Sequence, residues 1–347
     1  MVRWGVLGTA QIAKVCVIPA ILKSENGVLQ AIASRTLAKA QTLVEKHRQG
    51  VAYEGYAALL EDPEIDVVYI PLPNQLHKEW TIKALGAGKH VLVEKPFAMN
   101  AGEAEVMVDA AQRHGRLLME AFMYRFHPRS LRIKQLVEED ALGRISLIRS
   151  AFTFPVKRDG SNERLFLPEM GGGALWDVGC YGVSVARWLL SEEPIAVSAQ
   201  ADYSESGVDV NFAGALRFAS GALAVVECSF TAALQQTFSI MGENGAIELP
   251  HDAFIPWEKD ATFTLRGANV EQGQIVTVPG ADEYQLMIEH FADAVQGHAQ
   301  LAISPGEKCN QMRILGTLAR TLCSDEVVQL GDRDRPSKRY LRFTDYA

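Results

Sequence analysis

Three residues that can hold or move a proton lie in two short motifs of this sequence. Asp177 and Tyr181 are four positions apart in a glycine-rich run that opens a helical pattern. They would share one helix face, with their Cβ atoms about 5–6 Å apart. Lys95 stands in Glu94-Lys95-Pro96, at the end of an apolar strand pattern. A tyrosine beside an ammonium group is suited to general acid/base chemistry on a hydroxyl group.

Each of these residues also has a structural interpretation. Asp177 could only cap the helix, Tyr181 could be a half-buried aromatic residue, and Lys95 could be a solvated loop residue. In favour of chemistry, one ammonium about 4 Å from a phenolate stabilises it by roughly 4 kcal/mol at an effective dielectric of about 20. That energy would lower a tyrosine pKa from about 10 to about 7. We therefore expect Lys95 to lower the pKa of Tyr181, while burial of the phenolate opposes the shift.

A glycine turn at the start of the chain could hold a dinucleotide. Gly8-Thr9-Ala10-Gln11-Ile12 follows the first strand pattern and opens the first helix. Backbone N–H groups and the helix dipole at such a turn can bind a pyrophosphate. Ala10 stands where the G-x-G-x-x-G pattern has its second glycine, so the match is incomplete. The alternative interpretation is a tight strand-to-helix turn that needs small residues for packing.

The end of the second strand pattern indicates which dinucleotide is bound. An NAD enzyme usually has Asp or Glu there, accepting a hydrogen bond from the ribose 2′-hydroxyl. This sequence has Ser34-Arg35 instead. A hydroxyl beside a guanidinium can bind and neutralise a 2′-phosphate, which favours NADP(H). The alternative is a solvated loop arginine.

The elements that must position these motifs form two groups. In residues 1–125, β-rich runs alternate with helical patterns, which predicts an α/β Rossmann domain with a doubly wound parallel sheet that binds NADP. The expected strands are Trp4–Leu7, Leu29–Ser34, Val67–Ile70, His90–Val93 and Leu117–Glu120. The expected helices are Gln11–Leu22, Ala38–His47, His77–Ala87 and Ala101–His114, with Pro19 predicting a kink in the first.

In residues 126–347, closely spaced strands predict an α+β substrate-binding and dimerisation domain with a large, mainly antiparallel open sheet. Its expected strands are Ile145–Phe154, Ile195–Tyr203, Val210–Phe218, Leu223–Phe230, Thr237–Met241 and Ala246–Leu249. Its expected helices are Pro128–Glu139, one that ends near Leu190, Tyr284–Val295 and Pro305–Cys323. One sheet face would remain uncovered by helices, so we expect a homodimer or higher homo-oligomer, which sedimentation showing only monomer at micromolar concentration would rule out.

Composition excludes several classes of function. The 347 residues carry a formal charge of −8 without a basic block, which argues against nucleic acid as a partner. No apolar stretch is long enough to span a membrane, and no signal peptide pattern opens the chain. The 5 cysteines are odd in number and include no C-x-x-C pair, so we expect reduced thiols, no metal site and a cytoplasmic location.

Together these motifs resemble the Gfo/Idh/MocA (glucose–fructose oxidoreductase, inositol dehydrogenase) family. The resemblance covers nearly the whole chain and depends on the Gly8 turn, Pro73-Asn74-x-x-His77, Glu94-Lys95-Pro96 and the G-G-G-A-L-x-D-x-G-x-Y run that ends at Tyr181. The segment Met119–Pro128 is most similar to the branch that contains NADP-dependent xylose (aldose) dehydrogenases and dimeric dihydrodiol dehydrogenases.

The resemblance implies a role for each motif. Lys95 and Tyr181 would be the catalytic pair, with Asp177 binding a substrate hydroxyl. Arg125, His127 and Trp176 would be further substrate-binding residues, although the effect of the bulky Trp176 is open. The expected cofactor contacts are Gly8, Thr9, Ala10, Gln11, Ile12, Ser34, Arg35, Pro73, Asn74, His77, Glu94 and Lys95.

The sequence therefore predicts an NADP(H)-dependent dehydrogenase or reductase that acts on CH–OH groups. Its substrate would be a small molecule, either an aldose such as xylose or glucose or a vicinal diol. Such a reaction sends a hydride to the nicotinamide and needs a base for the hydroxyl proton. The alternative is a non-catalytic NADP-binding sensor on the same scaffold.

Overall fold

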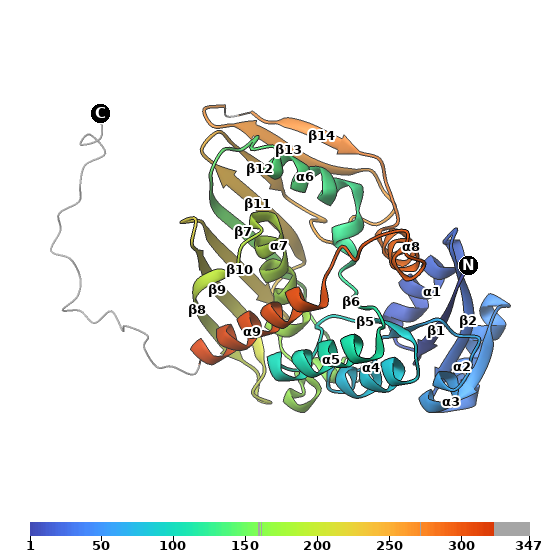
Figure 1. Ribbon diagram of the computed structural model, residues 1–347. Helices are drawn as coiled ribbons and strands as arrows, with labels where there is room; N and C mark the ends of the chain where they lie inside the picture. Colours follow the sequence, from blue (N-terminus) through green and yellow to red (C-terminus); the bar gives the residue numbers. More distant parts are fainter. Residues whose placement is uncertain (159, 161, 271, 323–347) are drawn as a thin grey trace, which may run out of the picture.

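The computed structural model describes residues 1–158, 160, 162–270 and 272–322, and it contains two sheets (Figure 1). The first is parallel, with six strands in the order β3-β2-β1-β4-β5-β6. These are β1 (Val2–Leu7), β2 (Gly27–Ser34), β3 (Val51–Glu54), β4 (Val67–Ile70), β5 (His90–Val93) and β6 (Leu118–Glu120). The chain order reverses direction between β1 and β4, which is where open α/β sheets bind ligands.

The strands of this sheet are apolar because helices cover both faces. All four residues of β4 are buried, as are the last three of β5. Short β3 and the helix after it escape the sequence prediction because β3 has no fully buried residue. The helical segments of this region are η1 (Ala13–Val17), α1 (Ile18–Lys23), α2 (Leu37–His47), α3 (Tyr56–Leu60), η2 (Asn74–Leu76), α4 (His77–Gly86) and α5 (Ala101–His114).

Pro19 affects the first helix differently from the expected kink. The π-helical turn η1 comes directly before α1, and Pro19 lies in the first turn of α1. Proline has no backbone N–H group, and the first turn of a helix does not need one. The irregular hydrogen bonding is therefore in the π-helical turn that precedes α1.

The second sheet has eight strands in the order β14-β13-β12-β11-β7-β10-β9-β8. Its pairs are antiparallel except β7 with β10, which are parallel. The bounds are β7 (Ile145–Thr153), β8 (Pro194–Tyr203), β9 (Asp209–Phe218), β10 (Leu223–Ser229), β11 (Gln235–Gly242), β12 (Gly245–Leu249), β13 (Ala261–Gly267) and β14 (Gln274–Val278). The predicted fold class is confirmed, although β13 and β14 extend the sheet beyond the expected strands.

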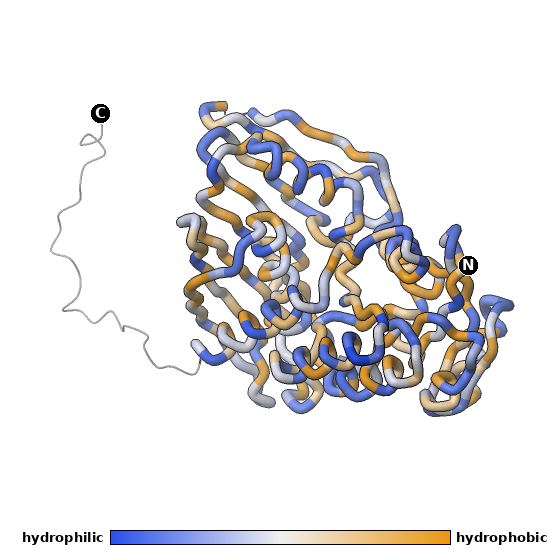
Figure 2. The backbone as a smooth tube through the Cα atoms, in the orientation of Figure 1, coloured by the Kyte–Doolittle hydropathy of each residue, from blue (hydrophilic) through white to orange (hydrophobic). Residues whose placement is uncertain are grey.

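Helices pack on one face of this sheet (Figure 1). Hydrophobic and polar residues alternate along its strands (Figure 2), as in β9, where one face of the strand is buried. The helical segments of this half are η3 (Met123–Phe126), α6 (Pro128–Glu138), η4 (Glu163–Phe166), η5 (Pro168–Met170), η6 (Leu175–Gly179), α7 (Cys180–Leu190), α8 (Glu283–Val295) and α9 (Pro305–Thr321). Cys323, the expected last residue of α9, lies outside the described residues.

The last two helices return to the first sheet. Helix α8 packs on α1, and its Phe291 ring lies 5.9 Å from the Trp4 ring. Helix α9 packs on α5, to which an Arg313–Glu105 ion pair of 2.6 Å joins it. The proposed division at residue 125 therefore separates the two sheets. Helices α8 and α9 follow that division in the chain but pack against helices of the first sheet.

Within the described part of the chain, no helix is both long and apolar enough to cross a membrane. The four cysteines described there, Cys16, Cys180, Cys228 and Cys309, are free and buried.

Candidate active site

A cleft of about 500 Å³ opens at the carboxyl ends of β1, β4 and β5 and extends to the second sheet. Most of the predicted site residues line it. They are Ala10, Gln11, Ile12, Pro73, Asn74, Glu94, Lys95, Asp177 and Tyr181. The fold therefore brings the glycine turn, the E-K-P motif and the G-G-G run into one place.

The glycine turn has a conformation that only glycine adopts readily. Gly8 has φ +102°, and a Cβ there would lie 3.1 Å from the Leu72 side chain. Thr9, half-buried, follows it, and the first turn of the helix then lines the cleft with Gln11 and Ile12. The first N–H groups of a helix have no partner within the helix, and this helix start lies at the cleft, as a pyrophosphate site requires.

Ser34 and Arg35 lie at the end of β2, with Ser34 buried and Arg35 exposed. The Gly8 N–H donates to the backbone oxygen of Ala33 at 2.7 Å, so the end of β2 lies beside the glycine turn. Arg35 is thus an exposed cation close to the glycine turn, where a 2′-phosphate would need one.

His77 has a different role from the expected cofactor contact. Its ring is fully buried, with Nδ1 2.9 Å from the Pro96 carbonyl oxygen and Nε2 2.8 Å from that of Leu72. Burial lowers the pKa of His77 to about 4. The ring therefore connects the loops that follow β4 and β5, and residues of both loops line the cleft.

Lys95 is bound to Asp177. Its Nζ donates to the Asp177 backbone oxygen at 2.5 Å and to Oδ1 at 3.1 Å. Burial disfavours both charges, but their attraction prevails: it raises the pKa of Lys95 and lowers that of Asp177. The pair therefore stays ionised in the cleft wall, next to Tyr181.

Tyr181 lies among aromatic rings. Those of Phe122, Phe152 and Phe254 are 5.2, 5.4 and 5.3 Å away between centroids. The Tyr181 hydroxyl donates to Met123 Sδ at 3.6 Å, and Lys95 Nζ is 5.5 Å from the centroid of its ring.

The expectation that the pKa of Tyr181 is lowered below its usual value is wrong for this structure. Burial raises the pKa of Tyr181 well above its usual value. Two observations explain this. Lys95 is oriented to Asp177, and the apolar surroundings disfavour a phenolate. Tyr181 is consequently a neutral phenol, which suits it to donate a proton.

The glycines of the G-G-G run let the start of the helix pack closely against β9. Gly173 has φ +115°, and a Cβ there would be 2.2 Å from Asp209 Oδ1. The other oxygen of Asp209 accepts a hydrogen bond of 2.7 Å from the Leu175 N–H. Asp209 of β9 thus caps this helix, and Asp177 is free to face Lys95.

Asp177 and Tyr181 come together through a π-helical turn. Asp177 lies in η6, whereas Tyr181 lies in the first turn of α7. A Cβ on Gly182 would be 2.4 Å from Ser150 Oγ, so the helix lies close against β7. Both side chains line the cleft, although the expected regular α-helix is absent between them.

Replacing Gly173 tests this packing. Gly173→Ala should lower the free energy of unfolding by about 3 kcal/mol or more, because it combines a strained φ with a clash against Asp209. Gly207 is the control: its φ is +85°, but open space surrounds it. Gly207→Ala should cost only about 1 kcal/mol. Denaturant unfolding of both variants measures the difference, and equal losses would contradict the role of Asp209.

Three predicted substrate-binding residues lie outside the cleft lining. Arg125 is buried and forms a two-bond fork with Glu307 of α9. His127 is fully buried, and its Nδ1 accepts from the Arg129 N–H at 3.0 Å as the N-cap of α6. Both side chains are bound within the fold and neither lines the cleft, so their role in substrate binding stays a prediction. Trp176 lines a neighbouring pocket of about 350 Å³.

Sequence reasoning missed several residues that line the cleft: Met123, Phe152, Phe154, Asn162, Arg164 and Tyr284. Arg164 is close to the charged pair, with Nη2 3.8 Å from Asp177 Oδ1. It lies in η4, in a stretch without periodic pattern, so only its charge beside the G-G-G run could have drawn attention to it. Tyr284 opens α8, far along the chain.

Comparison with known proteins identifies relatives over most of the chain. Residues 2–122 match the oxidoreductase family with an NAD-binding Rossmann fold (GFO_IDH_MocA), and residues 130–248 match the GFO/IDH/MocA C-terminal domain. The chain is 36% identical to D-xylose 1-dehydrogenase (NADP(+)) 2 of Haloferax volcanii, over 94% of this chain and 99% of that protein. It is 32% identical to trans-1,2-dihydrobenzene-1,2-diol dehydrogenase of Xenopus tropicalis, over 73% and 77% of the two chains.

A solved structure has the same arrangement of both sheets. It is the 3-ketoreductase KijD10 from Actinomadura kijaniata, crystallised with NADP and TDP-benzene. The two structures superimpose with a TM-score of 0.84 and 29% sequence identity, over 92% of this chain and 97% of that one.

Proposed function

This chain belongs to the Gfo/Idh/MocA family of oxidoreductases, and from that premise we propose that it is an NADP(H)-dependent dehydrogenase or reductase acting on a sugar or vicinal diol. An aldose such as xylose or glucose is the proposed sugar substrate. One observation carries the proposal. Lys95, Asp177 and Tyr181 meet in a single cleft, beside the glycine turn where a dinucleotide would lie.

The residues present fit NADP. The Gly8 turn and the helix start after it would hold the pyrophosphate, and Ser34 with Arg35 would bind the 2′-phosphate. Asn74, Glu94 and Lys95 would border the nicotinamide. When bound, the nicotinamide accepts or donates the hydride. The relatives named above include one called NADP-dependent and one crystallised with NADP.

Tyr181 would transfer the proton. In the reductive direction, its neutral phenol donates a proton to the carbonyl oxygen as the hydride arrives at carbon. In the oxidative direction, the phenolate takes the proton from the substrate hydroxyl. Asp177 would accept a hydrogen bond from a neighbouring hydroxyl, and Lys95 holds Asp177 in place. Lys95 would also stabilise negative charge on the phenol as it forms.

A substrate screen tests this function. The purified protein is mixed with NADP⁺ and xylose, glucose or a trans-dihydrodiol, and absorbance of the reduced nicotinamide is followed. We expect turnover of at least one of these compounds with NADP⁺. Binding of NADP⁺ without turnover of any sugar or diol, in either direction, would contradict an enzyme and favour an NADP-binding sensor.

Arg35→Asp tests the choice of cofactor. A carboxylate at this place repels the 2′-phosphate and can accept from the ribose hydroxyl of NAD⁺, so kcat/KM for NADP⁺ should fall far more than kcat/KM for NAD⁺. Steady-state kinetics with both cofactors measure this. Arg48→Asp, an exposed arginine at the far end of α2, is the control and should leave the preference unchanged. A wild-type preference for NAD⁺ would refute the role of Arg35.

The pH dependence follows from the raised pKa of Tyr181. Oxidation needs the phenolate, so its rate should keep rising with pH through the alkaline range. Reduction needs the phenol, so its rate should be flat around neutral pH and fall only in the alkaline range. Initial rates in both directions give the two profiles. An oxidation rate that is already constant at neutral pH would show that another group takes the proton.

A further inference from the structure

Gln311 of α9 holds the helix that carries Tyr181. Its side chain is fully buried, and its Nε2 donates to the backbone oxygen of Cys180 at 2.8 Å. Cys180 directly precedes Tyr181 in the chain. Gln311 Oε1 accepts from Arg187 Nη1, also at 2.8 Å, about two turns further along α7. One side chain therefore fixes α7 at two points.

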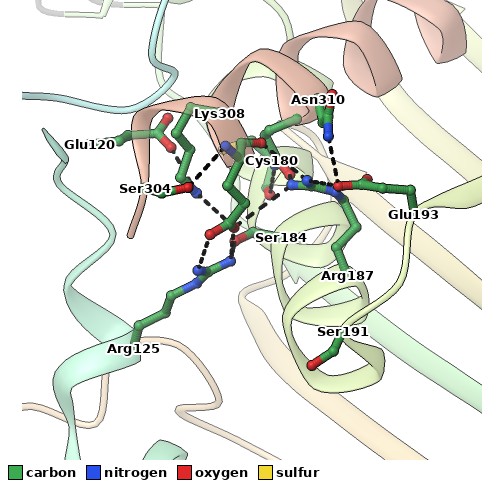
Figure 3. A network of polar contacts seen from close by, with 12 residues as sticks. Glu120, Arg125, Cys180, Ser184, Arg187, Ser191, Glu193, Ser304, Lys308 and Asn310 are labelled. Atoms are coloured by element: carbon green, nitrogen blue, oxygen red, sulfur yellow. Dashed lines mark hydrogen bonds and ion pairs between the residues drawn. The ribbon is translucent and has the colours of Figure 1, made fainter. Parts of the chain in front are cut away.

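Gln311 adjoins a network of charged side chains, most of them buried, which Figure 3 shows in part. Glu307, one turn earlier on α9, accepts two hydrogen bonds from Arg125, of 3.0 and 2.5 Å. Although burial opposes it, Lys308 and Arg125 lower the pKa of Glu307 to about 2. Lys308 Nζ is also 3.2 Å from Glu120 at the end of β6. These contacts fasten α9 to the first sheet.

Arg187 completes the network on α7. Its guanidinium forms a fork with Glu193, with bonds of 2.7 and 2.5 Å, beside its bond to Gln311. Three cations thus face three carboxylates: Arg125, Arg187 and Lys308 against Glu120, Glu193 and Glu307. Buried ion pairs add little net stability, because desolvation offsets their attraction. These pairs instead fix the position of α9 relative to α7 and the first sheet.

Tyr181 is held on its other side as well. Ser184 Oγ, one turn after Tyr181, accepts from the Tyr124 hydroxyl at 2.9 Å and from Arg125 Nη2 at 3.2 Å. Met123, whose sulfur accepts from the Tyr181 hydroxyl, lies in the same short helix η3 as Arg125. Apart from the Met123 contact with the Tyr181 hydroxyl itself, the bond from Gln311 is the one of these contacts made to the residue nearest Tyr181 in the chain.

We propose that Gln311 is a positioning residue, which sets the place of the Tyr181 hydroxyl by holding the Cys180 carbonyl. This inference rests on the proposed function, in which Tyr181 transfers the proton. Proton transfer requires a short and aligned contact, so a small shift of the phenol lowers the rate strongly. The proposed pyrophosphate and 2′-phosphate contacts, at the Gly8 turn and at Ser34–Arg35, belong to the first sheet, so NADP⁺ affinity should not depend on this bond.

Gln311→Met tests the proposal, because methionine has nearly the same length and removes both hydrogen bonds. We expect kcat to fall roughly 10-fold, with KM for NADP⁺ unchanged. Thermal unfolding establishes that the variant is folded at the assay temperature. Arg313→Met is the matched control: it lies on the exposed side of the same helix and loses the Glu105 pair. It should keep the wild-type kcat.

Gln311→Glu separates the two bonds of Gln311. An ionised glutamate beside Arg187 can still accept from Arg187 Nη1 but has no N–H for the Cys180 carbonyl. We expect its kcat to be as low as that of Gln311→Met. A wild-type kcat in Gln311→Glu would overturn the proposal.

A double variant distinguishes positioning from general loosening. In the Tyr181→Phe background no phenol remains to be positioned, so Gln311→Met should lower kcat no further. Additive losses would show that Gln311 acts on the whole structure and would overturn the proposal. If Tyr181→Phe alone keeps the wild-type turnover, the proposed function of Tyr181 fails. If Tyr181→Phe is impaired and Gln311→Met retains kcat, only the present inference fails.

Discussion

Tyr181→Phe should lower kcat by roughly 10²–10⁴ with little loss of NADP(H) affinity, because it removes the acid/base group and leaves the ring in place. The ring packs against several other aromatic rings, and its hydroxyl donates to Met123 Sδ. The variant should therefore fold normally. Steady-state kinetics in both directions, with cofactor affinity measured separately, give the effect.

Tyr53→Phe is the control for this substitution. Its hydroxyl donates to Asp62 at 2.9 Å, outside the cleft, so its loss should leave kcat unchanged. Near-wild-type turnover of Tyr181→Phe would exclude Tyr181 as the acid/base. Tyr284, the other tyrosine that lines the cleft, would then be the next residue to test. His127 is a weaker candidate than the sequence indicated, because it is buried as a helix cap.

Lys95→Met should lower kcat by roughly 10²–10³, since it removes the only ammonium group among the described residues that line the cleft. Without Lys95, the buried Asp177 carboxylate keeps only Arg164, at 3.8 Å, and the pKa of Asp177 should rise. KM for the sugar or diol should rise too, because Asp177 would no longer be held in place.

The Lys95→Met, Tyr181→Phe double variant tests whether the two residues act as a unit. Its kcat should be barely lower than that of either single variant, because Lys95 has little left to stabilise once the phenol is gone. Steady-state kinetics of the four proteins complete the cycle. Lys78→Met, which breaks an ion pair with Glu103 outside the cleft, should leave kcat unchanged. Independent, multiplied losses would contradict the pairing of Lys95 with Tyr181.

Local patterns in the sequence were enough to predict the architecture and most of the cleft. Strands and helices follow from the period of apolar residues, which each segment shows by itself. The Gly8 turn follows β1 and the E-K-P motif follows β5, and both lie at the carboxyl edge of the same parallel sheet with β4 between them, so topology brings them to one edge. The strands β13 and β14 were missed because few of their residues are fully buried, so their apolar pattern is weak.

Contacts between distant segments decided the electrostatics of the site. Lys95 reaches Asp177 across 82 positions of the chain, and Arg125 reaches Glu307 across 182. The Coulomb attraction of a charge depends on which opposite charge the fold places beside it, and desolvation depends on how deeply both are buried. Neither quantity can be read from a local pattern. Lys95 was therefore expected to lower the pKa of Tyr181, and Arg125 was expected to bind the substrate.

The sequence by itself determined the fold class, the glycine turn and the identity of the residues that can do chemistry, because these depend on backbone sterics and on periodic burial along single segments. Only the tertiary structure decided that Tyr181 is a neutral phenol, that Asp209 caps its helix and that Gln311 holds the preceding carbonyl. Each of these depends on side chains from separate elements that meet in the desolvated interior. A polar or charged group is stable there only beside a partner.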